Sequence, residues 1–180
     1  MRVSPICVTF VTILPARALA TDSVTIHGAF FREVHTEIQI AAPADAVWAE
    51  LTDFAAMPSW SRSLQSMEGD FREGGHVVVQ FMDQKGKVGK YEHDLIVWEA
   101  GRAFGWSDPI ISGLRDHHVY RITPTEGGCR FTQDDQAKGS MTLLLGGVAS
   151  NFMIGTYPVF NASLKARAEA RIAADAPAPL

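Results

Sequence analysis

The sequence has 180 residues, of which 47% are hydrophobic and 20% are charged, and its net charge is −4. This length is typical of one domain, and the hydrophobic content excludes a disordered or fibrous chain. Because the chain is mildly acidic and carries no basic stripe with interleaved aromatic residues, nucleic acid is not expected as a partner.

The first twenty residues differ in pattern from the rest of the chain. Arg2 precedes an apolar run over 6–14, and Ala18-Leu19-Ala20 fits the small-x-small pattern that a signal peptidase cleaves. The run is shorter than the roughly 20 apolar residues that span a bilayer. The pattern predicts a signal peptide over 1–20 and therefore an exported protein, periplasmic or secreted. The alternative is an unprocessed N-terminal strand or anchor.

Cleavage after Ala20 would leave Cys129 as the only thiol, which excludes an intramolecular disulfide. The local sequence around Cys129 offers no partner for a reactive thiol. We therefore expect Cys129 to be a small, buried strand residue.

The predicted domain, over 34–172, opens with a strand and two short helices, after an N-terminal extension over 21–33. Residues 34–40 alternate strictly between apolar and polar, which is typical of a half-buried strand. Pro43 suits the first turn of a helix, and apolar residues recur at helical spacing over 44–54. Met57-Pro58-Ser59-Trp60 breaks that helix and indicates a second short one.

Six further strand-like runs follow, separated by turns that contain glycine. Short runs of this kind at regular spacing predict an antiparallel meander. The six runs are 64–70, 76–83, 91–98, 102–108, 115–123 and 129–137.

The last segment is helical again, with an apolar stripe between Leu143 and Leu164 and a basic end. Pro158 is expected to kink or break this helix because it removes a backbone donor. The tail over 173–180 is expected to be disordered. One strand, two helices, six strands and one long helix define an α+β fold, with a curved seven-stranded sheet that must cover the helix.

Several segments resemble the START-like helix-grip superfamily, and more narrowly its bacterial polyketide cyclase/dehydrase and lipid-transport group. The resemblance is carried by the run from Ile38 to Phe54 with Pro58-Ser59-Trp60, by Gly101 to Phe104 with Trp106, and by the helix ending Ser163 to Glu169. It covers roughly 34–172 and implies a curved sheet wrapped around a C-terminal helix, with an internal cavity. It implies no one activity, because the superfamily includes lipid carriers, hormone receptors, aromatase/cyclases and hydratases.

Strand alternation predicts which side chains face the interior. In 115–123 the arginines belong in water, which turns Asp116, His118, Tyr120 and Ile122 inward. A tight turn at Glu126-Gly127 then places Ile122 opposite Phe131, Tyr120 opposite Gln133, and His118 opposite Asp135. A similar turn at Ala100-Gly101 pairs Val97 with Phe104, Leu95 with Trp106, and His93 with Asp108.

These faces predict a cavity with apolar walls and a few polar groups, a mixture typical of a small-molecule site. The alternative is that the same residues fill a solid core. The predicted ligand-binding residues are Met57, Trp60, Val79, Phe81, Tyr91, His93, Leu95, Phe104, Trp106, His118, Tyr120, Phe131, Gln133, Phe152, Met153 and Phe160.

The function predicted from these residues is non-covalent binding or transport of a small hydrophobic or lipid-like molecule, with no cofactor. The alternative is a cofactor-free cyclase or dehydratase in which Asp135 orients His118 as a general base, with Tyr120 as a further candidate. A satisfied buried histidine would explain His118 equally well. Adjacent strand residues point to opposite faces, so His117 and His118 do not suggest a metal site.

A transient membrane contact is a further hypothesis. Leu143-Leu144-Leu145 and Ile110-Ile111 are unusually apolar for a helix start and a loop, and could touch a bilayer or form a lid. Core packing is the alternative explanation. The sequence does not indicate an oligomeric state.

Overall fold

The computed structural model describes residues 22–83 and 85–175. The signal peptide predicted over 1–20 lies outside these residues. So does most of the tail predicted over 173–180, although residues 173–175 form the last part of a helix.

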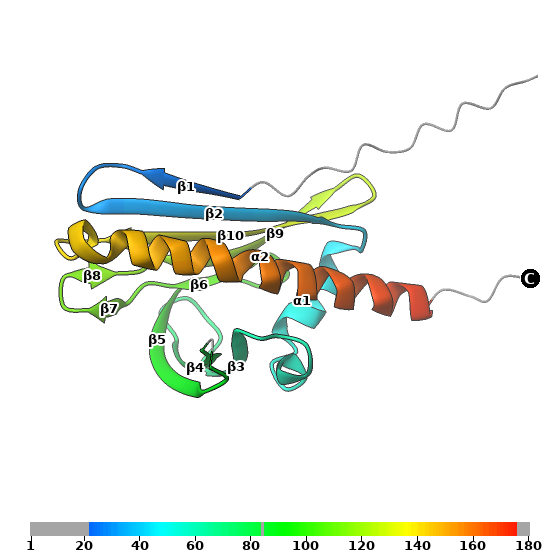
Figure 1. The fold of residues 1–180 in the computed structure, drawn as a ribbon. Coiled ribbons are helices and arrows are strands. Elements are labelled where there is room, and N and C mark those ends of the chain that lie inside the picture. The colour runs from blue at the N-terminus through cyan, green and yellow to red at the C-terminus, as the bar shows by residue number, and fades with distance from the viewer. Residues whose placement is uncertain (1–21, 84, 176–180) are drawn as a thin grey trace, which may run out of the picture.

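The chain forms one large antiparallel sheet and a long C-terminal helix (Figure 1). The strands are β1 (Asp22–Ile26), β2 (Phe31–Ile40), β3 (Leu64–Gly69), β4 (His76–Met82), β5 (Val88–Glu99), β6 (Ala103–Trp106), β7 (Pro109–Ile111), β8 (Leu114–Arg115), β9 (His118–Thr125) and β10 (Gly128–Lys138). The helices are α1 (Ala44–Thr52), the short η1 (Met57–Ser59) and α2 (Thr142–Asp175).

The strands follow the order β1-β2-β10-β9-β6-β5-β4-β3, with the β7–β8 hairpin attached to β10. The chain crosses from β2 to β3 through α1 and η1, which is why β2 pairs with the last strand, β10, and not with β3. The sheet curls at β3, β4 and β5, and α2 lies along its face over β2 and β10. The α+β helix-grip prediction is confirmed.

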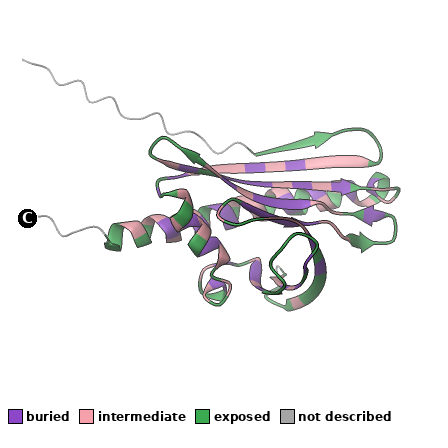
Figure 2. Ribbon diagram, turned by 180° about the vertical axis from the view of Figure 1, so that it is seen from behind, coloured by how far each residue is buried: buried purple, intermediate pink, exposed green. Residues whose placement is uncertain are grey.

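All seven predicted strands form, and three short ones were not predicted. The strand expected at 34–40 begins at Phe31, and β1 forms within the segment expected to be an N-terminal extension. Figure 2 shows β1 exposed along its length, in contrast to the central strands, where buried and half-buried residues alternate. The predicted kink or break at Pro158 does not interrupt α2, which continues through that residue.

The predicted register of β9 against β10 is confirmed: Ile122 pairs with Phe131, and Tyr120 with Gln133. Gly127 makes this tight turn possible, since its φ of 78° is a conformation that side chains disfavour. The register of β5 against β6 is only partly correct. Leu95 pairs with Trp106 as predicted, but an irregularity before Val97 shifts the ladder by one residue, so Phe104 pairs with Trp98.

The core lies between the concave face of the sheet, α2, and the α1–η1 segment. Its largest fully buried side chains include Trp106, Phe104, Phe131, Leu51 and Met57. Cys129 is also fully buried, as predicted, and burial raises the pKa of its thiol to about 11. Cys129 is therefore a packing residue at neutral pH.

Candidate functional site

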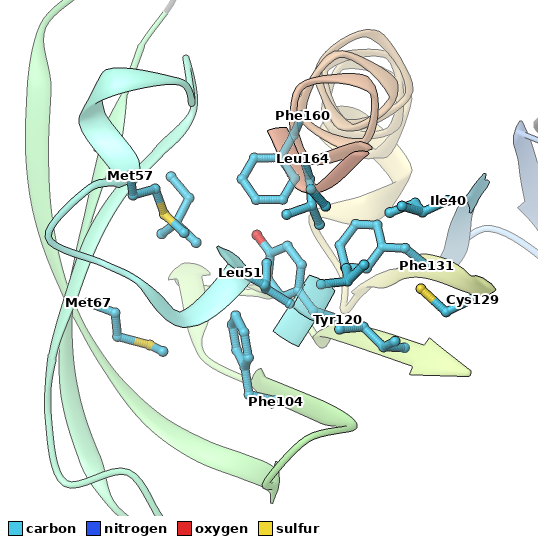
Figure 3. Close-up of a cluster of buried hydrophobic side chains, with 14 of the residues drawn as sticks. Ile40, Leu51, Met57, Met67, Phe104, Tyr120, Cys129, Phe131, Phe160 and Leu164 are labelled. Carbon is cyan, nitrogen blue, oxygen red and sulfur yellow. The ribbon is translucent and has the colours of Figure 1, made fainter. Parts of the chain in front are cut away.

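Most of the predicted ligand-binding residues lie together in the interior, around the ring of Tyr120. Figure 3 shows Tyr120 among side chains from α1, η1, the central strands and α2, with its hydroxyl pointing toward Phe160. The Tyr120 ring stacks on Phe104, with 4.8 Å between centroids, and on His118, with 4.3 Å. The buried members of the predicted set are Met57, Val79, His93, Leu95, Phe104, Trp106, His118, Tyr120, Phe131, Gln133, Met153 and Phe160; Trp60 and Phe81 are partly buried.

Two predicted lining residues lie elsewhere. Tyr91 is 53% exposed, because β5 extends beyond the core and Tyr91 sits on that extension beside Phe81. Phe152 is 49% exposed, because it lies on the outer side of α2, whereas the next residue, Met153, faces the sheet. Neither residue contributes to the interior.

A chain of hydrogen bonds joins the inner face of the sheet to α2. His118 Nε2 lies 3.0 Å from Gln133 Oε1, and Gln133 Nε2 donates to Asn161 Oδ1 at 2.5 Å. Asn161 Nδ2 in turn donates to Thr36 Oγ1 at 3.0 Å. Since Gln133 Oε1 can only accept, this chain makes Nε2 the protonated nitrogen of His118. The chain of hydrogen bonds also fixes the rotation of α2 about its own axis relative to β9, β10 and β2.

Asp135 lies opposite His118, but its closest side-chain partner is Tyr157 of α2. The Tyr157 hydroxyl donates to Asp135 Oδ2 at 2.5 Å, whereas His118 Nδ1 is 3.8 Å from the same oxygen. The predicted proximity of His118 and Asp135 is therefore observed, but 3.8 Å exceeds a hydrogen bond. The Tyr157 ring also stacks on His118, with centroids 4.7 Å apart.

Burial shifts the pKa values of the two facing groups in opposite directions. It lowers the pKa of His118 from 6.5 to about 4. It raises the pKa of Asp135 from 3.8 to about 6, against the hydrogen bond from Tyr157, which lowers it. Burial also raises the pKa of Tyr120 and Tyr157 well above 10. At pH 7 Asp135 is therefore mostly ionised, beside the neutral imidazole of His118 and the neutral phenols of Tyr120 and Tyr157.

A second imidazole–carboxylate pair lies on the other side of Trp106. His93 Nδ1 is 2.7 Å from Asp108 Oδ2, a contact that the predicted pairing of these residues anticipated. The His93 ring stacks on Trp106, with centroids 5.0 Å apart, and the His118 ring contacts Trp106 edge-to-face, with centroids 5.4 Å apart. The two histidines thus flank one indole.

Several polar atoms in this region are buried without a hydrogen-bond partner. They include His93 Nε2 and Trp60 Nε1. The Tyr120 side chain is 3% exposed, and its hydroxyl makes no hydrogen bond to the described residues. An unsatisfied buried polar group costs about 1–3 kcal/mol, so such groups need an explanation. The remaining buried and unpartnered side-chain atoms among the described residues are Ser66 Oγ and Thr142 Oγ1.

Two open hollows lie on the surface outside the interior cluster. One of about 590 Å³ lies between α1 and the C-terminal half of α2, where Glu50, Arg167 and Arg171 meet Trp60. The other, of about 550 Å³, lies between the start of α1 and the β9–β10 turn. Of the predicted ligand-binding residues, Trp60 lines the first hollow and none lines the second.

Sequence reasoning missed Tyr157 and Asn161, which complete the polar network. Both follow Met153 at helical spacing, and Leu164 continues the same stripe toward the sheet. That spacing was the available signal. Within the described residues, no group of three or more His, Cys, Asp or Glu side chains is placed to hold a metal ion.

A curved antiparallel sheet wrapped around a C-terminal helix, with a polar network between them, defines the helix-grip class of α+β proteins. The family model described as polyketide cyclase/dehydrase and lipid transport matches residues 32–169. The chain belongs to this family. No curated protein matches the sequence.

Solved structures show the same fold at low sequence identity. A protein from Rhodobacter sphaeroides aligns with a TM-score of 0.63 and 17% identity, covering 87% of this chain and 100% of its own. A Nitrosomonas europaea protein aligns with a TM-score of 0.62 and 16% identity, covering 82% and 99%. The di-domain ARO/CYC StfQ from the steffimycin biosynthetic pathway aligns with a TM-score of 0.63 and 14% identity, covering 81% of this chain and 53% of StfQ. Identities this low support the fold alone.

Proposed function

We propose that this protein binds a small hydrophobic or lipid-like molecule non-covalently, between the sheet and α2, and carries it. The observation that supports this most directly is the pair of unpartnered buried atoms, His93 Nε2 and Trp60 Nε1. Both belong to side chains that otherwise pack against aromatic rings. A ligand with an apolar body and one or two polar groups would satisfy them.

The surroundings allow such a molecule to be accommodated by repacking. Met57, Met67 and Met153 border the cluster, and thioether side chains adapt readily to a changed shape. Trp106, Phe104 and Phe131 would supply apolar contacts, and the ligand's own apolar surface contributes about 25 cal/mol for each Å² that leaves water. The Asp108 carboxylate fixes the ring orientation of His93. When Nδ1 carries the proton, His93 Nε2 accepts a hydrogen bond from the ligand.

The test begins with native mass spectrometry of protein purified from its own host, followed by extraction and identification of any bound molecule. A panel of fatty acids, lysophospholipids and polycyclic phenols is then screened by thermal shift. We expect at least one to raise the melting temperature. Protein that is empty and also shows no shift with the whole panel would contradict the proposal.

A matched pair of variants locates the site. Tyr120→Phe removes an interior hydroxyl that has no protein partner, whereas Tyr91→Phe removes an exposed one. If the ligand bonds to Tyr120, its loss weakens binding of the panel's best compound about fivefold, since a hydrogen bond is worth about 1 kcal/mol. Tyr91→Phe should leave affinity unchanged. Equal effects of the two changes would place the ligand elsewhere.

The alternative function is a cofactor-free cyclase or dehydratase that uses His118, Asp135 and Tyr120. The observation that favours it is the raised pKa of Asp135, about 6, which suits a general base near neutral pH. The 3.8 Å separation and the packing around His118 favour the binding function instead. Once a substrate is known, His118→Ala should abolish turnover, and unchanged activity would remove His118 from the mechanism.

We also propose that the protein is exported. The support for this is the sequence pattern, in which Arg2, the apolar run over 6–14 and Ala18-Leu19-Ala20 match a cleavable signal peptide. N-terminal sequencing of protein from the fractionated host should begin at Thr21, and a mature chain that retains Arg2 would contradict export by cleavage.

A further inference from the structure

The first two-thirds of α2 is an unusual helix for a surface position. Residues 142–164 contain no Asp, Glu, Lys, Arg or His. The helix is long and apolar enough to cross a bilayer by length and composition, yet only 22% of its most apolar 18-residue window is buried. Because Met153, Phe160 and Leu164 pack against the core, α2 is a core helix with an apolar outer side.

That outer side continues into an apolar surface at one end of the molecule. Leu143, Leu144, Val148 and Phe152 of α2 are each at least 49% exposed. Ile110 and Ile111 of the β7–β8 hairpin, at 49% and 44%, and Phe30 of the β1–β2 turn, at 57%, are exposed as well. We call these seven residues the apolar end.

The three segments of the apolar end lie together. Met141 N donates to Gly113 O at 2.8 Å, which joins the start of α2 to the β7–β8 hairpin. Gly139 N donates to Phe30 O at 3.0 Å, which joins the same segment to the β1–β2 turn. Figures 1 and 2 show all three at the same end of the sheet, opposite the C-terminus of α2. A contiguous exposed apolar surface of this kind marks an interaction site.

Cationic side chains lie directly behind the apolar end. Lys138 pairs with Arg115 across the sheet, and its ammonium group lies 4.5 Å from the Phe31 ring centroid. Arg32 reaches the first turns of α2 beside Gly146. Among the described residues, none of these three cations forms an ion pair, while the neighbouring carboxylates Glu33 and Asp108 bind His27 and His93.

We infer that the apolar end docks onto the surface of an anionic lipid bilayer. An apolar tip backed by unpaired cations matches an interface where acyl chains lie beneath negative headgroups. A symmetric dimer through this end would instead bring the cations of two copies together, which is unfavourable. The inference is independent of the proposed ligand, because it concerns the outer surface only.

Vesicle flotation tests this directly, with phosphatidylcholine vesicles compared with phosphatidylcholine/phosphatidylglycerol vesicles. We expect binding to the anionic vesicles that weakens as salt is added. Leu144→Asp should reduce it at least tenfold, whereas Val88→Asp, an exposed apolar position on β5, should not. Lys138→Gln should weaken binding about fivefold, the effect of one basic residue at an anionic surface, and Lys90→Gln on β5 should not.

Each outcome decides the inference. Circular dichroism and thermal unfolding of the four variants establish that they fold, which their exposed positions lead us to expect. No binding by the wild-type protein, or equal loss in the β5 controls, would overturn the inference. So would a dimer in sedimentation that Leu144→Asp dissociates without any vesicle binding, since the apolar end would then belong to a second copy. A failed ligand screen with intact vesicle binding would affect the proposed function alone.

Discussion

His118 and Asp135 face each other in the interior, and folding shifts their pKa values in opposite directions. Burial holds the pKa of His118 at about 4. The stability that the neutral His118 contributes is therefore present above pH 6.5 and is lost as the pH falls toward 4. Burial holds the pKa of Asp135 at about 6. The stability that the protonated Asp135 contributes is therefore present below pH 3.8 and is lost as the pH rises toward 6. Between pH 4 and 6 the two trends oppose one another.

Asp135→Asn isolates one of these trends. The amide retains an acceptor for the Tyr157 hydroxyl but cannot ionise. We expect the free energy of unfolding of the variant to rise more steeply with pH between 4 and 6 than that of the wild type, by about 1 kcal/mol per pH unit. Urea unfolding at pH 4, 5, 6 and 7 measures this difference.

Asp94→Asn provides the matched control, because Asp94 is a largely exposed carboxylate that pairs with His76 on the outer surface. Its curve should have the slope of the wild type. If the Asp135→Asn curve also ran parallel to the wild type, Asp135 would not be protonated in the folded state near pH 5, and a pKa raised to about 6 would be contradicted.

At the scale of elements, the sequence was informative wherever a strand has one buried face. Alternation between apolar and polar residues predicts the strand at 34–40, and the regular spacing of six further runs between glycine turns predicts the others. The unpredicted β1 has no buried residue, and β7 and β8 are only three and two residues long. Edge strands of this kind carry no periodicity, so composition alone could not reveal them.

The same limit explains which parts of the site were predicted. The β9–β10 turn fixes the register, so Tyr120, Gln133, His118 and Asp135 could be placed correctly relative to one another. The helical spacing of Met153 and Tyr157 places them on one stripe of α2, but the rotation of the docked helix decides which stripe faces the sheet. Tyr157 was therefore missed, and Phe152 was wrongly turned inward. The irregularity in β5 likewise has no signature in composition.

At the scale of the whole molecule, the two ends of α2 are held very differently. Near its C-terminus, the carboxylate of the buried Glu50 accepts hydrogen bonds from Arg167 at 2.5 Å and from Arg171 at 3.1 Å, which ties α2 to α1. The N-terminal half, over 142–158, buries Thr142, Gly146, Ser150 and Met153, but it contains no charged residue and forms no ion pair. The half that carries the apolar end therefore lacks the ion pairs that hold the other half.

This asymmetry predicts graded opening of α2, from the apolar end toward the C-terminus. Amides over 147–156 should exchange with deuterium faster than those over 161–171, because local opening there breaks no ion pair and therefore requires less free energy. Glu50→Gln should speed exchange over 161–171, since it weakens both arginine contacts, whereas Glu92→Gln, an exposed control on β5, should not. Hydrogen exchange followed by mass spectrometry resolves the two segments. Uniform protection along α2 would show that the helix moves as one body, and the predicted graded opening would then be wrong.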